Sequence, residues 1–324
     1  MQVLDFKRKR GTVTGIMTTR PTEFEWPTLL MMGLTYGLWA LGTMLWDVSA
    51  VLSILLTAVT IAQFSSLQHE VLHGHPFANR RLNEALVFPA LTLVMPYERF
   101  RDLHLRHHFD PNLTDPFDDP ESNFAAPEVW ARLSPPAKAL LQLHNTLFGR
   151  MLLGPAISCW YLITQDWALA RNGTPGIVRA WAMNAAGVGL VLIWLFTLAT
   201  MPVWAYLVAA YLGYSLVKIR TYLEHRAHDA PRARTVVIED RGPLSILFLN
   251  NNFHVVHHMH PTTPWYRLPA LYASRREHFL RRNDAYVYRS YAEIFRRYFF
   301  RPKDPVPHPM FPVRKVDEDA ITSV

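Results

Sequence analysis

Residues 250–260 read Asn250-Asn251-Asn252-Phe253-His254-Val255-Val256-His257-His258-Met259-His260. The histidines at 254, 257 and 258 have an HxxHH spacing. Residues three and four positions apart share one face of a helix, so all three imidazoles can point the same way. An adjacent His-His pair can direct one imidazole to each of two metal ions. This stretch therefore predicts one part of a dinuclear site assembled from several helices.

Two similar clusters lie upstream: His69-Glu70-Val71-Leu72-His73-Gly74-His75 and His104-Leu105-Arg106-His107-His108. Imidazole suits iron, zinc, copper and nickel. About nine histidines exceed what one ion can bind, whereas two ions with four or five nitrogen ligands each fit the supply. Iron is favoured because an all-imidazole site with open positions can activate dioxygen, although the ligand type alone leaves zinc and copper open.

Long apolar runs separate the histidine clusters. Trp26 to Trp46, Val48 to Gln68 and Ala180 to Val217 contain no charged residue, and Pro202 lies near the middle of the last run. A bilayer core of about 30 Å needs ~20 apolar residues per helix. We therefore expect an all-α integral membrane protein with four transmembrane helices in two hairpins. A water-soluble protein with buried helices is disfavoured, because such long runs rarely stay uncharged in soluble helices.

The basic cluster at residues 7–10 predicts a cytoplasmic N-terminus. An even number of crossings then places all the histidine clusters and both termini on the cytoplasmic side, in a helical cap. We expect a basic N-terminal segment at 1–25, a membrane domain at 26–270 and a cytoplasmic C-terminal segment at 271–324. The stretch 85–97 is too short to span and predicts a re-entrant or surface-lying element. Met151 to Gln165 predicts an interfacial helix, with embedding in the membrane as the alternative.

The net charge of +7 and the pI of about 9.6 agree with binding to anionic lipid headgroups. The arginines fall beside apolar runs and in the C-terminal part, so no nucleic-acid partner is expected. The single cysteine, Cys159, excludes intramolecular disulfides and a Cys-rich metal site.

The three histidine boxes, the two hairpins between them and the Asn-Asn run before the third box resemble the membrane fatty acid desaturase family. That family lies within the larger group of membrane di-iron desaturases, hydroxylases and ketolases. The resemblance covers roughly residues 25 to 270 and is more specific for the superfamily than for the reaction. It implies two iron ions with these ligands: His69, His73, His104, His107, His108, His254, His257, His258 and one further residue after the fourth helix. His225 matches that further position best, and His228 is the second candidate.

Other side chains near the boxes are candidates to touch the metal or to orient a ligating imidazole. They are Glu70, His75, Asp102, Asp115, Asp119, Glu224, His228, Asn251, Asn252 and His260. The alternative for the acids is that they cap helices or pair with arginines. His144, His278 and His308 are isolated and are expected at the surface or the membrane interface.

The resemblance implies an oxygen-dependent di-iron oxidoreductase that introduces a double bond into a fatty acyl chain or a related lipid. The alternatives are a lipid or carotenoid hydroxylase or ketolase, or an oxidative decarboxylase. No catalytic side chain beyond the metal ligands is expected. The cofactors would be two iron ions with dioxygen as co-substrate. A separate electron donor, ferredoxin-like or a b-type cytochrome, is implied because no segment is left for such a module.

The first box also satisfies HExxH, the zinc metalloprotease signature, with Glu70 as the general base. A protease leaves the two HxxHH boxes and His225 unexplained. A metal-binding or transport protein would place its histidines within the membrane, whereas these follow the ends of the predicted helices.

Overall fold

The structure, a computed structural model, describes residues 24–109 and 113–311. The predicted basic N-terminal cluster and the last residues of the C-terminal segment lie outside these ranges. The described chain is mostly helical, as predicted. One small parallel sheet is found in these ranges, in which β1 (Val237–Ile238) pairs with β2 (Val287–Tyr288).

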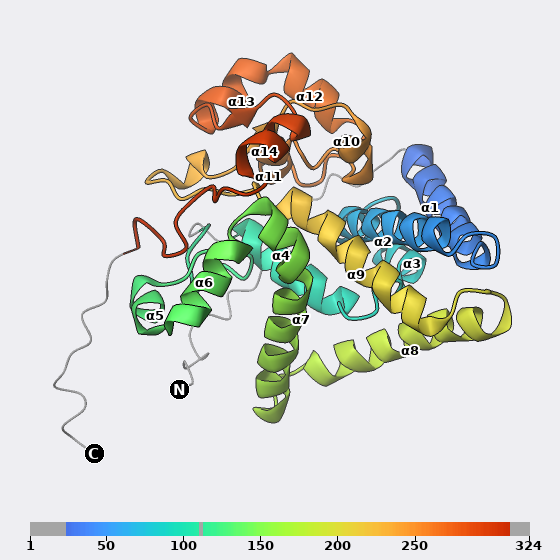
Figure 1. The fold of residues 1–324 in the computed structure, drawn as a ribbon. Helices are drawn as coiled ribbons and strands as arrows, with labels where there is room; N and C mark the ends of the chain where they lie inside the picture. Colours follow the sequence, from blue (N-terminus) through green and yellow to red (C-terminus); the bar gives the residue numbers. More distant parts are fainter. Residues whose placement is uncertain (1–23, 110–112, 312–324) are drawn as a thin grey trace.

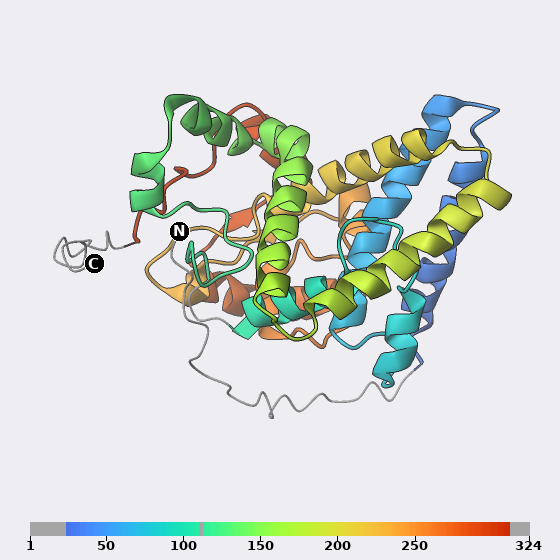
Figure 2. The same cartoon turned by 90° about the horizontal axis from the view of Figure 1, so that it is seen from below.

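Two helical hairpins form where the sequence predicts them. Helices α1 (Trp26–Met44) and α2 (Ala50–Leu72) make the first, and Ser49 caps α2 by accepting the backbone N–H of Leu52 at 3.3 Å. Helices α8 (Ile177–Thr197) and α9 (Val203–Thr221) make the second, with Pro202 at the turn. Figures 1 and 2 show both hairpins gathered at one side of the molecule. Helix α9 packs along α2 and so joins the second hairpin to the first.

Three helices are long and apolar enough to cross a membrane: α2, α7 (Leu147–Arg171) and α8. The other two predicted spans form as α1 and α9, and the four-span arrangement stays a prediction. Helix α7 is longer than the interfacial helix expected at 151–165. Arg150 and Asp166, expected at its ends, lie inside it and are buried. They lie inside because each finds polar partners in the fold, such as His144 O at 3.2 Å from Arg150 Nε.

The stretch 85–97 packs inside the protein. Helix α3 (Arg80–Leu86) leads into a turn-rich segment whose Val87 and Leu91 are fully buried. The hydroxyl of Tyr206 on α9 donates to the Leu91 carbonyl at 2.9 Å. Gly187 on α8 allows the closest approach, since a Cβ there would lie 2.4 Å from the Phe88 carbonyl oxygen. Both helices of the second hairpin therefore contact this segment.

The remaining helices are mostly short and surround the histidine boxes. They are α4 (Tyr97–Phe109), α5 (Pro127–Arg132), α6 (Pro135–His144), the 3-10 helix η1 (Pro231–Ala233), α10 (Pro243–Leu247), α11 (His254–Met259), α12 (Leu268–Ser274), α13 (Arg276–Arg282) and α14 (Tyr291–Tyr298). The domain boundary expected at residue 270 falls inside α12, and the β1–β2 pairing joins the chain on its two sides. The described part of the C-terminal segment is therefore packed onto the rest of the protein.

Candidate metal centre

Nine imidazoles from distant parts of the chain meet in two groups. The first group contains His69, His73, His104, His108 and His257. The second group contains His107, His225, His254 and His258. Within each group, the candidate ligand atoms all lie within 4.8 Å of one another. The division into five and four agrees with the number of nitrogen ligands expected for two ions.

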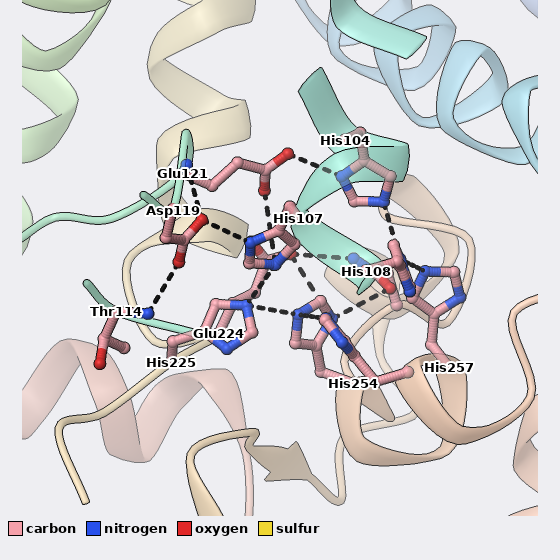
Figure 3. Close-up of polar contacts among 12 residues, drawn as sticks. His104, His107, His108, Thr114, Asp119, Glu121, Glu224, His225, His254 and His257 are labelled. Carbon is pink, nitrogen blue, oxygen red and sulfur yellow. Dashed lines mark hydrogen bonds and ion pairs between the residues drawn. The ribbon is translucent and has the colours of Figure 1, made fainter. Parts of the chain in front are cut away.

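Four chain segments supply these side chains. The last turn and C-cap of α2 carry the first box, α4 carries the second and α11 carries the third, while His225 lies just beyond α9. Each adjacent His-His pair is split between the groups. His108 belongs to the first group and His107 to the second, and His257 and His258 divide in the same way. Two short helices thus serve both groups, as the HxxHH spacing predicts (Figure 3).

Distances between the imidazoles fit a shared ion. His104 Nε2 and His257 Nε2 each lie 3.0 Å from His108 Nε2. In the second group, His225 Nε2 lies 2.9 Å from His107 Nε2 and 3.1 Å from His254 Nε2. Two nitrogens held at right angles about 2.1 Å from one ion are about 3 Å apart. The donor set and its spacing therefore fit metal ions that accept imidazole.

Two further imidazoles have a free nitrogen inside the first group. His69 Nε2 and His73 Nε2 are buried and have no hydrogen-bond partner among the described residues. A buried polar atom without a partner costs free energy and needs an explanation. A metal ion would supply the missing partner for both lone pairs.

Burial keeps most of these imidazoles neutral, which is the form that binds metal. Burial and the neighbouring imidazoles hold the pKa of His257 and of His258 well below the ordinary histidine value. His107 is the exception. Burial would lower its pKa, but Glu121 and the hydrogen bond with Asp119 outweigh burial and raise that pKa to about 9.

Two carboxylates orient the second box. Asp119 Oδ1 accepts from His107 Nδ1 at 2.7 Å, and Glu121 Oε1 accepts from His104 Nδ1 at 2.7 Å. The backbone N–H groups of Thr114 and Glu121 donate to Asp119 and fix it in turn (Figure 3). Asp119 was expected near the metal, whereas Glu121 was not among the candidates. The only signal for Glu121 was its place in the acidic loop after the second box.

The Asn-Asn run braces the third box. Asn251 Oδ1 lies 3.3 Å from His254 Nδ1, and Asn251 Nδ2 donates to Glu224 Oε1 at 2.9 Å. Asn251 and Glu224 therefore lie next to the second group, on the side of His254 Nδ1. Asn252 instead donates to the Ile238 carbonyl at 2.6 Å and holds the chain that leads into α11.

Several other candidates lie elsewhere. Asp115 accepts the backbone N–H groups of Phe117 and Asp118 and so caps a turn. Asp102 pairs with Arg101 at 2.7 Å. The acid-capping and arginine-pairing alternatives therefore describe these two residues.

The remaining histidines fall outside both groups. His228 Nε2 lies 3.3 Å from Asp284 Oδ2, so His225 and not His228 joins the metal ligand candidates in space. His260 packs its ring against Phe279. His308 is buried, contrary to expectation, because its Nε2 meets the Thr114 hydroxyl at 3.1 Å.

His75 forms a separate buried cluster with Glu25 and Glu70. His75 Nδ1 lies 2.7 Å from Glu25 Oε1, and Glu70 Oε1 accepts the Trp265 N–H at 2.9 Å. Glu70 therefore does not join His69 and His73, where the general base of an HExxH protease would be needed.

Comparisons with known proteins agree with the box pattern. A family model described as "Fatty acid desaturase" matches residues 46–290. The Delta(6)-fatty-acid desaturase fat-3 of Caenorhabditis elegans is 24% identical over 285 residues, which cover 77% of this chain and 62% of that protein. The beta-carotene ketolase of a Paracoccus species is 26% identical over 250 residues, which cover 72% of this chain and 84% of that protein. The chain thus spans less than two thirds of the nematode relative.

Proposed function

Because the chain belongs to the fatty acid desaturase family, we propose that it is a membrane di-iron oxidoreductase that desaturates an acyl chain or a related lipid. Family membership and the three apolar helices support a membrane-associated oxidoreductase with a lipid acyl substrate. We further propose that the cofactor is two iron ions, that dioxygen is the co-substrate and that the product carries a new double bond.

The observation that carries the proposal is the pairing of a five-histidine group with a four-histidine group. Each group would hold one iron ion. Bound there, the two ions would supply the activation of dioxygen and the removal of hydrogen from an unactivated carbon. The protein's part is to hold neutral imidazoles in place, to fix them through Asp119, Glu121 and Asn251, and to exclude water.

The electrons for this reaction would come from a separate donor, ferredoxin-like or a b-type cytochrome. We propose that the boxes and both termini face the cytoplasm, so that such a donor reaches the centre from that side. The four spans predicted from the sequence give an even number of crossings between the boxes, and this prediction and the basic cluster at residues 7–10 support this orientation.

One relative is named a fatty acid desaturase and the other a carotene ketolase. Both outcomes begin with removal of a hydrogen atom and differ in how the substrate lies. Desaturation of an acyl lipid leads because the matched family model is that of the desaturases. Hydroxylation, ketolation and oxidative decarboxylation are the alternative reactions, and their products would be an alcohol, a ketone and an alkene.

The test is to express the full chain in a host that lacks such enzymes and to profile its lipids by mass spectrometry. Products lighter by two hydrogens are expected, and products heavier by one oxygen would replace desaturation with hydroxylation. His257→Ala is the inactive control, since it removes a member of the five-histidine group. Metal analysis should find about two iron ions per chain, and about one zinc without iron would overturn the di-iron centre.

A further inference from the structure

A small cavity lies between the first box and the start of the second-box helix. Its volume is about 80 Å³. It is lined by Gln68, Glu84, Val87, Phe88, Ala90, Tyr97, Glu98, Ala180, Met183 and Asn184. A single water needs roughly 10–15 Å³ of such space, and a drug-sized ligand needs a few hundred. The cavity therefore fits a small group and not a whole acyl chain.

Two polar side chains face this cavity without a partner. Gln68 is only 2% exposed, and its amide makes no hydrogen bond with the described residues. The hydroxyl of Tyr97 has no such partner either. Asn184 uses its Nδ2 on the Leu93 carbonyl at 2.7 Å, which leaves its Oδ1 free. Buried amides are nearly always satisfied, so the free groups indicate something polar in the cavity.

The charged side chains at the cavity are already neutralised. Glu84 pairs with Arg80 at 2.7 Å and with Arg101 at 2.6 Å, and Glu98 pairs with Arg179 at 2.7 Å. Among the described residues that line the cavity there is no cation to hold a carboxylate or a phosphate, and Glu84 and Glu98 would repel either group. The free functions, an amide and a hydroxyl, suit an uncharged oxygen that accepts or donates a hydrogen bond.

We propose that this cavity binds an uncharged oxygen group of the lipid substrate, an ester carbonyl or a hydroxyl, through Gln68 and Tyr97. The inference rests on the proposed lipid substrate and narrows its chemical class. Gln68 directly precedes His69 on α2, and Tyr97 lies seven residues before His104 on α4, a rise of about 10 Å. The oxygen group would therefore be held beside the first box, where it positions the chain that reaches the histidines.

The experiment measures binding and does not depend on turnover. The full chain in lipid nanodiscs is loaded with a spin-labelled fatty methyl ester, whose immobilised fraction is followed by EPR. Four competitors of equal chain length are then added: methyl octadecanoate, 1-octadecanol, octadecane and octadecanoate. The ester and the alcohol are expected to compete about tenfold better than the hydrocarbon, and their ranking distinguishes the two sources of oxygen.

Variants locate the preference in the cavity. Gln68→Leu and Tyr97→Phe should each reduce the advantage of the ester and the alcohol over the hydrocarbon about three- to tenfold, which is the value of one hydrogen bond. Met183→Leu is the matched control, because Met183 lines the same cavity and offers no comparable hydrogen bond. Both test variants should keep the metal content of the unchanged protein. If Gln68→Leu fails to fold, Tyr97→Phe and the competitor series still decide.

Equal competition by ester, alcohol and hydrocarbon would overturn the inference and leave water as the occupant. So would a preference that neither Gln68→Leu nor Tyr97→Phe reduces, or strongest competition by octadecanoate. If lipid products still form in any of these cases, the proposed function stands while the inference fails. If the ester and the alcohol compete better than the hydrocarbon and both variants reduce this difference, but no lipid product forms, the inference stands while the proposed function fails.

Discussion

Arg99, which is largely buried, and Asp166, which is fully buried, form an ion pair that joins α4 to α7. Arg99 Nη2 lies 2.7 Å from Asp166 Oδ1, and Arg99 Nε lies 2.9 Å from Asp166 Oδ2. Trp181 on α8 donates its Nε1–H to the same carboxylate at 2.9 Å. One carboxylate thus fixes the helix of the second histidine box against two others.

Asp166→Asn should destabilise the protein by about 3 kcal/mol, because it leaves the Arg99 guanidinium buried without its counter-charge. Thermal unfolding in detergent and the iron content per chain measure the effect. Arg179→Gln is the control, since the Arg179 side chain is 69% exposed in its pair with Glu98 and should contribute less than about 1 kcal/mol. Equal losses in the two variants would argue against a special role for the buried pair.

His225→Ala should remove metal from the second group, whereas His228→Ala should not. His225 stands among the ligand candidates, and His228 contacts Asp284 instead. The two residues are three positions apart, so the pair is a matched comparison. Iron content and lipid products are measured for both. Full iron and full activity in His225→Ala would exclude it as a ligand.

Glu121→Gln should reduce metal affinity or activity about 10- to 100-fold, the usual effect of losing a carboxylate behind a metal-binding histidine. Glu121 accepts from His104 Nδ1, and an amide cannot reproduce its charge. Asp115→Asn is the control in the same loop, because Asp115 caps a turn and touches no histidine. Iron affinity is measured by competition with a chelator, and an unchanged value would refute the assignment.

Below about pH 6.5 the metal-free protein should lose stability as the pH falls. Burial and neighbouring imidazoles hold the pKa values of His254, His257 and His258 below the ordinary value. Under these conditions the unfolded chain binds more protons than the folded one, with a slope up to about 1.4 kcal/mol per pH unit for each histidine. His107, with its pKa raised to about 9, contributes in a different range, since the stability that it provides is lost as the pH rises from about 6.5 to about 9.

Thermal unfolding of the metal-free protein at neutral and mildly acidic pH measures this slope. His257→Gln should make it shallower, while His278→Gln, at an exposed position outside both groups, should leave it unchanged. Stability that rises on acidification would contradict the expected sign.

Gly187→Ala should destabilise the protein by about 1–3 kcal/mol through overpacking. The added Cβ would lie 2.4 Å from the Phe88 carbonyl oxygen, which is backbone and cannot move aside easily. Gly189→Ala on the same helix is the control, since a Cβ there meets nothing within 4 Å. Thermal unfolding of both variants is the measurement, and equal midpoints would speak against close packing of α8 on this segment.

The common direction of the imidazoles within each box could be foreseen because it depends on local helix geometry. HxxHH spacing places the imidazoles on one face, and the structure divides each adjacent pair between two groups. The helices of the two hairpins could also be predicted, because long uncharged runs are visible in the sequence alone.

Other features depend on contacts across space and left little trace in the sequence. Asp166 was taken for the end of an apolar helix because its partner, Arg99, lies on a different element. Glu121 gained its place from a fold that brings its loop beside His104. His308 was expected at the surface because no local pattern signals its contact with Thr114.

Along the chain, both hairpins precede the last of the ligand candidates. The first group needs His257 and the second needs His258, so neither is complete until the ribosome has passed residue 258. Both hairpins have been synthesised by then. In the proposed metal centre, metal binding could therefore contribute free energy to folding only after the chain up to residue 258 has been made.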